Sequence, residues 1–288
     1  MIKYIHCFGT SYTAGGGHEF DATGPGRSLD SPRSEAREHI QNLIKVYSKK
    51  YPNEEQTLYN CSWPGQLQKL IKDDIEVINH AKSGYGNERM YEITYDIVSK
   101  PEFNKDEHLF LYEFSALGRK QLWSNTLNKY IITNYIIDDK NKLNYNGAAV
   151  DYFYDKGDTI KIIDKISDDI IIPFYKETLE MKSAMKKLEI NNHMFLDYLS
   201  YNNVNWMFTA DPFYYDFERY DRKHFFKFPD NNHNFVNYFH DKDLTITKET
   251  EGKVIDGHMS ITGAKIIAGF VANRLKELNY LKEPYLLI

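Results

Sequence analysis

The amino-acid sequence predicts an α/β fold in which helices cover both faces of a central parallel β-sheet. Short apolar runs with the length and the β-branched or aromatic content of buried strands lie at residues 2–8, 76–79, 109–114 and 204–209. Segments with apolar residues at helical spacing separate these runs. Such alternation is typical of a parallel sheet, whose loops at the carboxyl ends of the strands form the functional site.

Length and composition favour a single domain with insertions. The chain has 288 residues, and α/β folds often exceed about 200 residues as one unit. Hydrophobic residues make up 42% and charged residues 27%, which is ordinary globular composition with enough apolar material for a large core. We therefore expect one domain over 1–288, with inserts at about 120–160 and 211–252.

The first strand ends at Gly9, and the turn after it carries Ser11. A polar, glycine-rich stretch from Ala14 to about Ser34 is predicted to be a loop. Helical spacing of Ile40, Leu43, Ile44 and Tyr47 then predicts a helix from Glu35, and a second helix is expected over 65–71.

Later segments complete the expected alternation. Residues 90–98 have a helical pattern, whereas 119 to about 160 show no clear period and are interpreted as an insertion. A long mixed helical stretch is expected over 161–200, followed after the fourth strand by an irregular region over 211–252. Residues 261–278 predict an amphipathic helix that ends the fold.

Charge and cysteine content exclude several classes of function. The net charge is -5 and the basic residues are scattered among acids, so no nucleic-acid partner is expected. Cys7 and Cys61 form neither a disulfide framework nor a C-x-x-C pair. We see no signal-peptide pattern and no membrane span, so we expect a soluble cytoplasmic protein, although a non-classical export route or a place in a virus particle would leave no mark in the sequence. We expect no cofactor.

The second insert contains histidines and a dense aromatic run. The histidines at 224, 233 and 240 match no tight zinc spacing, so we expect no metal site there. The aromatic run has two interpretations, a surface that binds a ligand or plain packing. Its members are Phe213, Tyr214, Tyr215, Phe217 and Tyr220.

Three short blocks carry the chemistry. Gly9-Thr10-Ser11 follows the first strand, where a sharp turn can expose a hydroxyl; a helix-capping serine is the alternative. The block 79–87 follows the second strand, and its glycines permit a turn that aims N–H groups at a developing negative charge. Asp256-Gly257-His258 precedes the last helix and supplies an acid and a base. Phosphate-loop patterns are absent.

In this order, the blocks resemble the SGNH, or GDSL-like, hydrolase family. Gly9-Thr10-Ser11 stands where that family has Gly-Asp-Ser, Gly84 where it has its oxyanion glycine, and Asp256 and His258 where it has its late acid and base. The resemblance covers roughly half of the chain and implies a three-layer sandwich with the flavodoxin-like strand order. Residues 120–250 are not covered.

The resemblance implies acyl transfer by a serine nucleophile. Ser11 would attack an ester carbonyl, His258 would take its proton as general base, and Asp256 would orient the imidazole. The N–H groups of Ser11 and Gly84 would hold the oxyanion, and no metal is required.

Two departures from the family matter. Thr10 replaces the family's Asp, and the G-x-N-D block is missing, since the chain reads Glu113-Phe114-Ser115-Ala116 after the third strand. Some family members resemble this chain in lacking that block and in carrying an Arg a few residues on, as Arg119 does here. Asp256 and His258 are two residues apart, whereas a separation of three is commoner in the family.

The missing Asn leaves a third oxyanion donor to be found. We favour Asn87, whose amide donates well and which lies on the same loop as Gly84. Ser115, at the exit of the third strand, is the alternative. A different interpretation of Asn87 is that it caps a helix beginning near Glu88.

These observations predict a serine esterase that hydrolyses small acyl esters, with O-acyl carbohydrates as one substrate class. An O-acyltransferase would use the same residues with a hydroxyl acceptor in place of water. The rival prediction is a binding or structural protein that keeps the fold without turnover.

Overall fold

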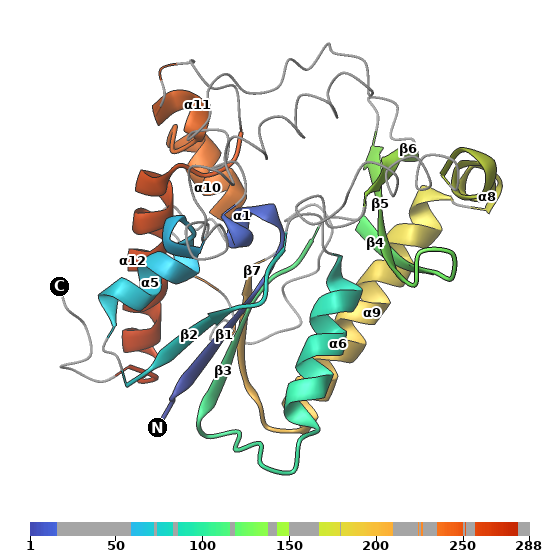
Figure 1. Ribbon diagram of the computed structural model, residues 1–288. Helices are drawn as coiled ribbons and strands as arrows, with labels where there is room; N and C mark the ends of the chain where they lie inside the picture. Colours follow the sequence, from blue (N-terminus) through green and yellow to red (C-terminus); the bar gives the residue numbers. More distant parts are fainter. Residues whose placement is uncertain are drawn as a thin grey trace.

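The computed structural model describes residues 1–15, 59–71, 74–82, 86–115, 119–137, 143–149, 167–178, 180–209, 224, 226, 235–249, 251 and 257–281. Its centre is a four-stranded parallel sheet in the order β2-β1-β3-β7 (Figure 1). The strands are β1 (Tyr4–Phe8), β2 (Glu76–Asn79), β3 (His108–Glu113) and β7 (Asn205–Thr209). All four predicted strands are confirmed.

Helices cover both faces of this sheet. On one face, α5 (Trp63–Leu70), α10 (Phe235–Asp241) and α12 (Ile261–Glu277) pack on strand residues such as Ile5 and Leu109. On the other face, α6 (Asn87–Val98) and α9 (Met181–Tyr201) pack on Phe8 and Phe110. The expected three-layer α/β sandwich is confirmed, and its strand order matches the first four strands of the flavodoxin-like order.

The connections place a topological switch point between β1 and β3. The chain passes from β1 to β2 through α5 on one face, and from β3 to β7 through α9 on the other face. The loops that leave β1 and β3 at their carboxyl ends therefore diverge to opposite faces. Ligands of open α/β sheets bind in the crevice that such divergence creates.

Local signals explain where two of these helices begin. The Ser62 hydroxyl oxygen accepts a hydrogen bond from the Gly65 N–H at the start of α5, over 3.3 Å. Ser260 does the same for Gly263 at the start of α12, over 3.0 Å. Serine in the N-cap position satisfies a backbone donor that the helix itself leaves unpaired.

The first insert is not irregular where the structure describes it. Antiparallel strands β4 (Arg119–Ser124), β5 (Lys129–Ile137) and β6 (Leu143–Ala149) form a second sheet in that order. Our interpretation of this region as an insertion without period missed these strands, because β4 alternates weakly and the aromatic side chains of Trp123 on β4 and Tyr130 on β5 are exposed. The predicted stretch over 161–200 contains a π-helical turn (Ser167–Ile171), α8 (Ile172–Thr178) and α9.

The second insert also contains regular structure. Helices α10 and α11 (Ile246–Glu249) lie within 211–252, so the expectation of an irregular region is wrong for that part. Most of 211–234, with its aromatic run, lies outside the described residues, as does the helix expected from Glu35. The final helix is confirmed as α12. No helix in the described part of the chain is both long and apolar enough to cross a membrane.

Candidate active site

The turn after β1 places Ser11 at the carboxyl end of a central strand. Helix α1 (Ser11–Ala14) begins at Ser11 itself, and the Ala14 N–H donates to the Thr10 carbonyl over 2.9 Å. Gly15 then takes a φ of 85°, a left-handed conformation that suits glycine. The turn therefore lies beside the switch point, on the β1 side (Figure 1). The side chain of Ser11 lies outside the described part of the structure.

The carboxylate of Glu113 binds this turn on both sides of Ser11. Glu113 is the last residue of β3 and is 5% exposed. Its Oε1 accepts from the Thr10 hydroxyl at 2.6 Å, and its Oε2 accepts from the Thr13 hydroxyl at 2.6 Å. Oε2 also accepts from the backbone N–H groups of Thr10 and Thr13, over 3.1 and 3.2 Å. The two residues that flank the Ser11-Tyr12 pair are thus fixed to β3.

The direction of one of these bonds is settled by a third partner. The indole N–H of Trp63 donates to the Thr13 hydroxyl oxygen over 3.0 Å. Because an indole can only donate, the Thr13 proton is free to point at Glu113. Burial raises the pKa of the Glu113 carboxyl above its ordinary value, while the bonds from Thr10 and Thr13 and the charge of Arg119 act in the opposite direction.

Close packing explains why Gly9 stands between the strand and the turn. A Cβ at this position would clash with Glu113 Oε2 and with the Thr13 hydroxyl. Glycine is therefore required for the carboxylate to approach the backbone, which is a steric reason for the Gly of the Gly9-Thr10-Ser11 block.

Asn79 holds the turn from the neighbouring strand. Its Nδ2 donates to the Thr13 carbonyl over 3.0 Å, and its Oδ1 accepts from the Ala81 N–H over 3.0 Å. The end of β2 and the loop that follows it are thereby tied to the Ser11 turn. Gly84, the expected oxyanion glycine on that loop, lies outside the described residues.

His258 lies at the same end of the molecule as the turn. It is half-buried two residues before the Ser260 cap of α12, and its carbonyl accepts from the Ile246 N–H over 2.9 Å. Figure 1 shows α1 and the start of α12 at the end toward which the strands point. Helix α12 packs beside α5, in the same buried cluster as Trp63. Asp256 lies outside the described residues.

The structure gives Asn87 a role that we did not expect. Its Oδ1 accepts from the Ser115 N–H over 2.7 Å, and its Nδ2 donates to Asn192 of α9 over 3.1 Å. Asn87 is 1% exposed, and Tyr91 also donates to Asn192. These hydrogen bonds and the burial of the side chain argue against the oxyanion role that we favoured for Asn87. The capping interpretation is wrong, because α6 begins at Asn87 and Gly86 is its N-cap.

Ser115 and Arg119 come from the exit of β3. Ser115 is 2% exposed, and its backbone N–H is held by Asn87. Arg119 is the first residue of β4, and its charge acts on the Glu113 carboxyl. Arg119 therefore acts on the carboxyl that holds the Ser11 turn, whereas the backbone of Ser115 is held by α6.

Comparison of the chain with protein-family models, with curated proteins and with solved structures finds no match. The chemical interpretation of the site therefore depends on its own residues and geometry. Sequence reasoning missed Glu113 and Asn79. The signal for Glu113 was an acid at the end of an otherwise apolar run, where a buried charge requires a partner.

A histidine array crosses the sheet on its α6 face. His6 Nδ1 lies 3.0 Å from His80 Nε2, and His6 Nε2 lies 2.8 Å from His108 Nδ1. Burial lowers the pKa of His6 to about 3 and that of His80 to about 4, and it also lowers the pKa of His108. Within the described ranges, no group of three His, Cys, Asp or Glu side chains is arranged to hold a metal ion.

The histidines of the second insert are differently placed. His224 stacks on Trp206 with ring centroids 3.8 Å apart, and its Nδ1 contacts the Trp206 carbonyl at 2.9 Å. His240 is exposed at the end of α10, and His233 lies outside the described residues.

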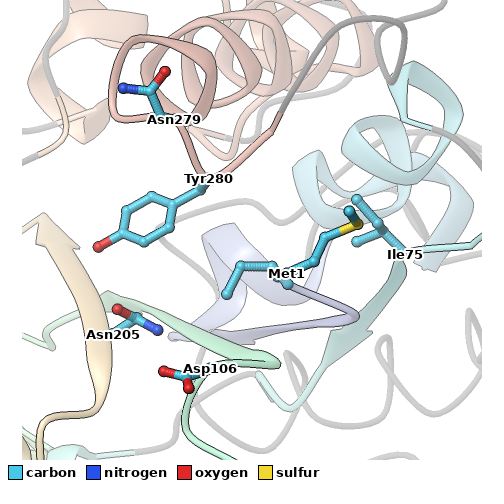
Figure 2. Close-up of a pocket in the computed structure, with 7 residues that line it drawn as sticks. Met1, Ile75, Asp106, Asn205, Asn279 and Tyr280 are labelled. Carbon is cyan, nitrogen blue, oxygen red and sulfur yellow. The ribbon is translucent and has the colours of Figure 1, made fainter.

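A pocket of about 420 Å³ lies at the opposite end of the sheet (Figure 2). Its lining includes Met1 before β1, Asp106 before β3 and Asn205 at the start of β7. These are the amino ends of the strands. Because sites of open parallel sheets lie at the carboxyl ends, we do not assign this pocket to the candidate active site.

Proposed function

We propose that this protein is a serine hydrolase that cleaves acyl esters, with Ser11 as nucleophile. The observation that carries the proposal is the rigid turn at the carboxyl end of β1. Ser11 is the first residue of α1, beside the switch point, and hydrogen bonds from β2 and β3 hold the residues around it. Positions held this firmly are the kind that preorganised catalysis requires.

The proposed reaction proceeds in two steps. His258 takes the Ser11 proton as the oxygen attacks the ester carbonyl, Asp256 orients the imidazole, and the N–H groups of Ser11 and Gly84 stabilise the oxyanion. The alcohol leaves with a proton returned by His258. Water then attacks the acyl-serine, and the carboxylic acid is released.

O-acyl carbohydrate is the substrate class that we propose first among small esters, by resemblance to the SGNH family. The same acyl-serine would serve an O-acyltransferase if a sugar hydroxyl replaced water. Mass analysis of products, with and without added acceptor alcohols, separates hydrolysis from transfer.

A binding protein without turnover is the second candidate, and the state of Asn87 favours it. Its amide donates to Asn192 and the residue is only 1% exposed, so the oxyanion donor expected from the sequence is buried in this structure. Removing a single such donor typically costs about 10² to 10³ in kcat. A chain with only two backbone donors would be a slow enzyme or an inert one.

A fluorophosphonate probe decides between the two candidates. The full-length protein is treated with the probe and digested, and the adduct is located by mass spectrometry. We expect one adduct, on Ser11. Ser11→Ala should abolish it, and Ser99→Ala, at the exposed end of α6, should leave it unchanged. Wild-type protein without an adduct, or an adduct that persists in Ser11→Ala, would reject the assignment.

A further inference from the structure

Glu113 is an unusual residue for its place in the sheet. Leu109 and Leu111, which point to the same face of β3, are fully buried in the apolar cluster under α5 and α12. An apolar side chain would suit position 113 equally well by packing alone. Burying a carboxylate is costly unless hydrogen bonds satisfy it.

All four hydrogen bonds that the structure gives this carboxylate come from the Ser11 turn. Two are hydroxyl bonds of 2.6 Å from Thr10 and Thr13, and two are backbone N–H bonds from the same residues. The carboxylate is therefore satisfied only when the turn adopts this conformation. A displacement of the turn would break all four of these hydrogen bonds to a buried carboxyl.

We propose that Glu113 is a positioning residue that fixes the orientation of Ser11 through Thr10 and Thr13. The proposal rests on the proposed function of Ser11 as nucleophile. Glu113 touches neither substrate nor the reacting proton in this arrangement, because it is buried and its oxygens are occupied by the turn. It acts on Ser11 through the backbone on either side.

Glutamine is the conservative replacement that separates geometry from charge. In Glu113→Gln, the side-chain carbonyl can accept the three bonds that reach Oε2, and the amide can donate to the Thr10 hydroxyl oxygen, which can also accept. This variant is therefore expected to keep the turn in place. Glu113→Leu removes all acceptors, and Thr13→Val removes one donor.

Thr94→Val is the matched control. Thr94 is fully buried on α6, on the opposite face of the sheet, and its hydroxyl lies 2.9 Å from the Tyr112 hydroxyl. This variant makes the same substitution as Thr13→Val and also removes a buried hydrogen bond. It does not touch the Ser11 turn.

The first readout is the second-order rate of fluorophosphonate labelling at Ser11, measured well below the thermal midpoint of every variant. A displacement of about 1 Å can cost about 10²-fold in rate, so we expect a loss of that order in Glu113→Leu. Thr13→Val should lose about tenfold, whereas Glu113→Gln and Thr94→Val should stay within about threefold of wild type. Wild-type labelling in a folded Glu113→Leu protein would overturn the proposal.

The second readout is amide hydrogen exchange in residues 9–15, which needs no catalytic activity. Exchange of the Thr10 and Thr13 amides should accelerate in Glu113→Leu and Thr13→Val, and remain slow in Glu113→Gln and Thr94→Val. Unchanged exchange in Thr13→Val would overturn the proposal even if Glu113→Leu fails to fold. If wild type shows no Ser11 adduct, the proposed function fails, and the exchange data alone decide whether Glu113 positions the turn.

Discussion

At the scale of single residues, hydrogen-bond partners show which elements each buried polar side chain holds together. Asn87 and Glu113 are both polar, buried and close to the exit of β3. Asn87 connects β3 to α9, whereas Glu113 connects β3 to the Ser11 turn. Their substitution should therefore affect different properties.

Replacing members of the proposed triad should abolish activity without unfolding the protein. We expect Ser11→Ala and His258→Ala each to lower kcat on a short-chain activated ester by about 10⁴ to 10⁶. Asp256→Ala should lose less, since another acid or water can orient the imidazole. Steady-state kinetics and thermal midpoints check this; turnover that survives in Ser11→Ala contradicts it.

Asn87→Ala should reduce stability more than catalysis. The substitution leaves the Ser115 N–H without its acceptor in a buried place, which typically costs about 1–3 kcal/mol. We expect denaturant unfolding to show this loss while kcat changes less than about threefold. Ser115→Ala, measured beside it, keeps the backbone bond. A fall in kcat of about 10² or more in Asn87→Ala would restore the oxyanion role.

At the scale of elements, N-cap residues fix the chain where two helices begin beside the candidate site. Ser260 caps α12 two residues after His258, and Ser62 caps α5 directly before Trp63, the indole partner of Thr13. The same N-cap interaction therefore anchors the chain next to two parts of the site. Each cap stabilises the first turn of its helix and fixes the position of the residues just before that helix.

Loss of the α12 cap should lower both the stability of the protein and its esterase activity. Ser260→Ala removes the acceptor for the Gly263 N–H and should lower the free energy of unfolding by about 1 kcal/mol. Esterase activity should also fall, because His258 lies two residues before the cap. Ser260→Thr, which preserves an N-cap hydroxyl, serves as control and should recover most of both properties. Equal losses in the Ala and Thr variants would contradict a capping role.

At the scale of the whole molecule, the histidine array links stability to pH. The folded-state pKa of His6, about 3, lies below the ordinary value, so the folded protein binds fewer protons than the unfolded chain between these values. Stability from His6 and His80 is present above about pH 6.5 and is lost as pH falls toward 4 and 3. Glu113, whose pKa is raised, contributes in the opposite sense and loses stability as pH rises.

His6→Phe should weaken the acid destabilisation. Phenylalanine suits the aromatic stack that His6 forms with Phe110, whose ring centroid lies 4.7 Å away. Each histidine contributes at most about 1.4 kcal/mol per pH unit, so the difference in unfolding free energy between pH 6.5 and pH 5 should shrink by up to about 2 kcal/mol. Phe110→Leu, which does not titrate, should destabilise equally at both pH values. An unchanged pH dependence in His6→Phe would refute the linkage.

The sequence by itself determined the layers of this fold. Apolar runs of strand length and apolar residues at helical spacing depend on neighbours within a few positions, and such local periodicity predicted β1, β2, β3, β7 and α12. It failed for β4 to β6; among the residues that the structure describes there, Trp123 on β4 and Tyr130 on β5 are exposed, and the burial of β4 alternates weakly.

Only the tertiary structure decided which side chains meet. Glu113 lies about a hundred positions from Thr10 and Thr13, and His6 lies as far from His108, yet parallel pairing of β1 with β3 brings each set together. Register between distant strands has no periodic signal in the chain, because it follows from burial and hydrogen bonding of the whole sheet. The sequence could therefore suggest Ser11, but not the carboxylate that holds its turn.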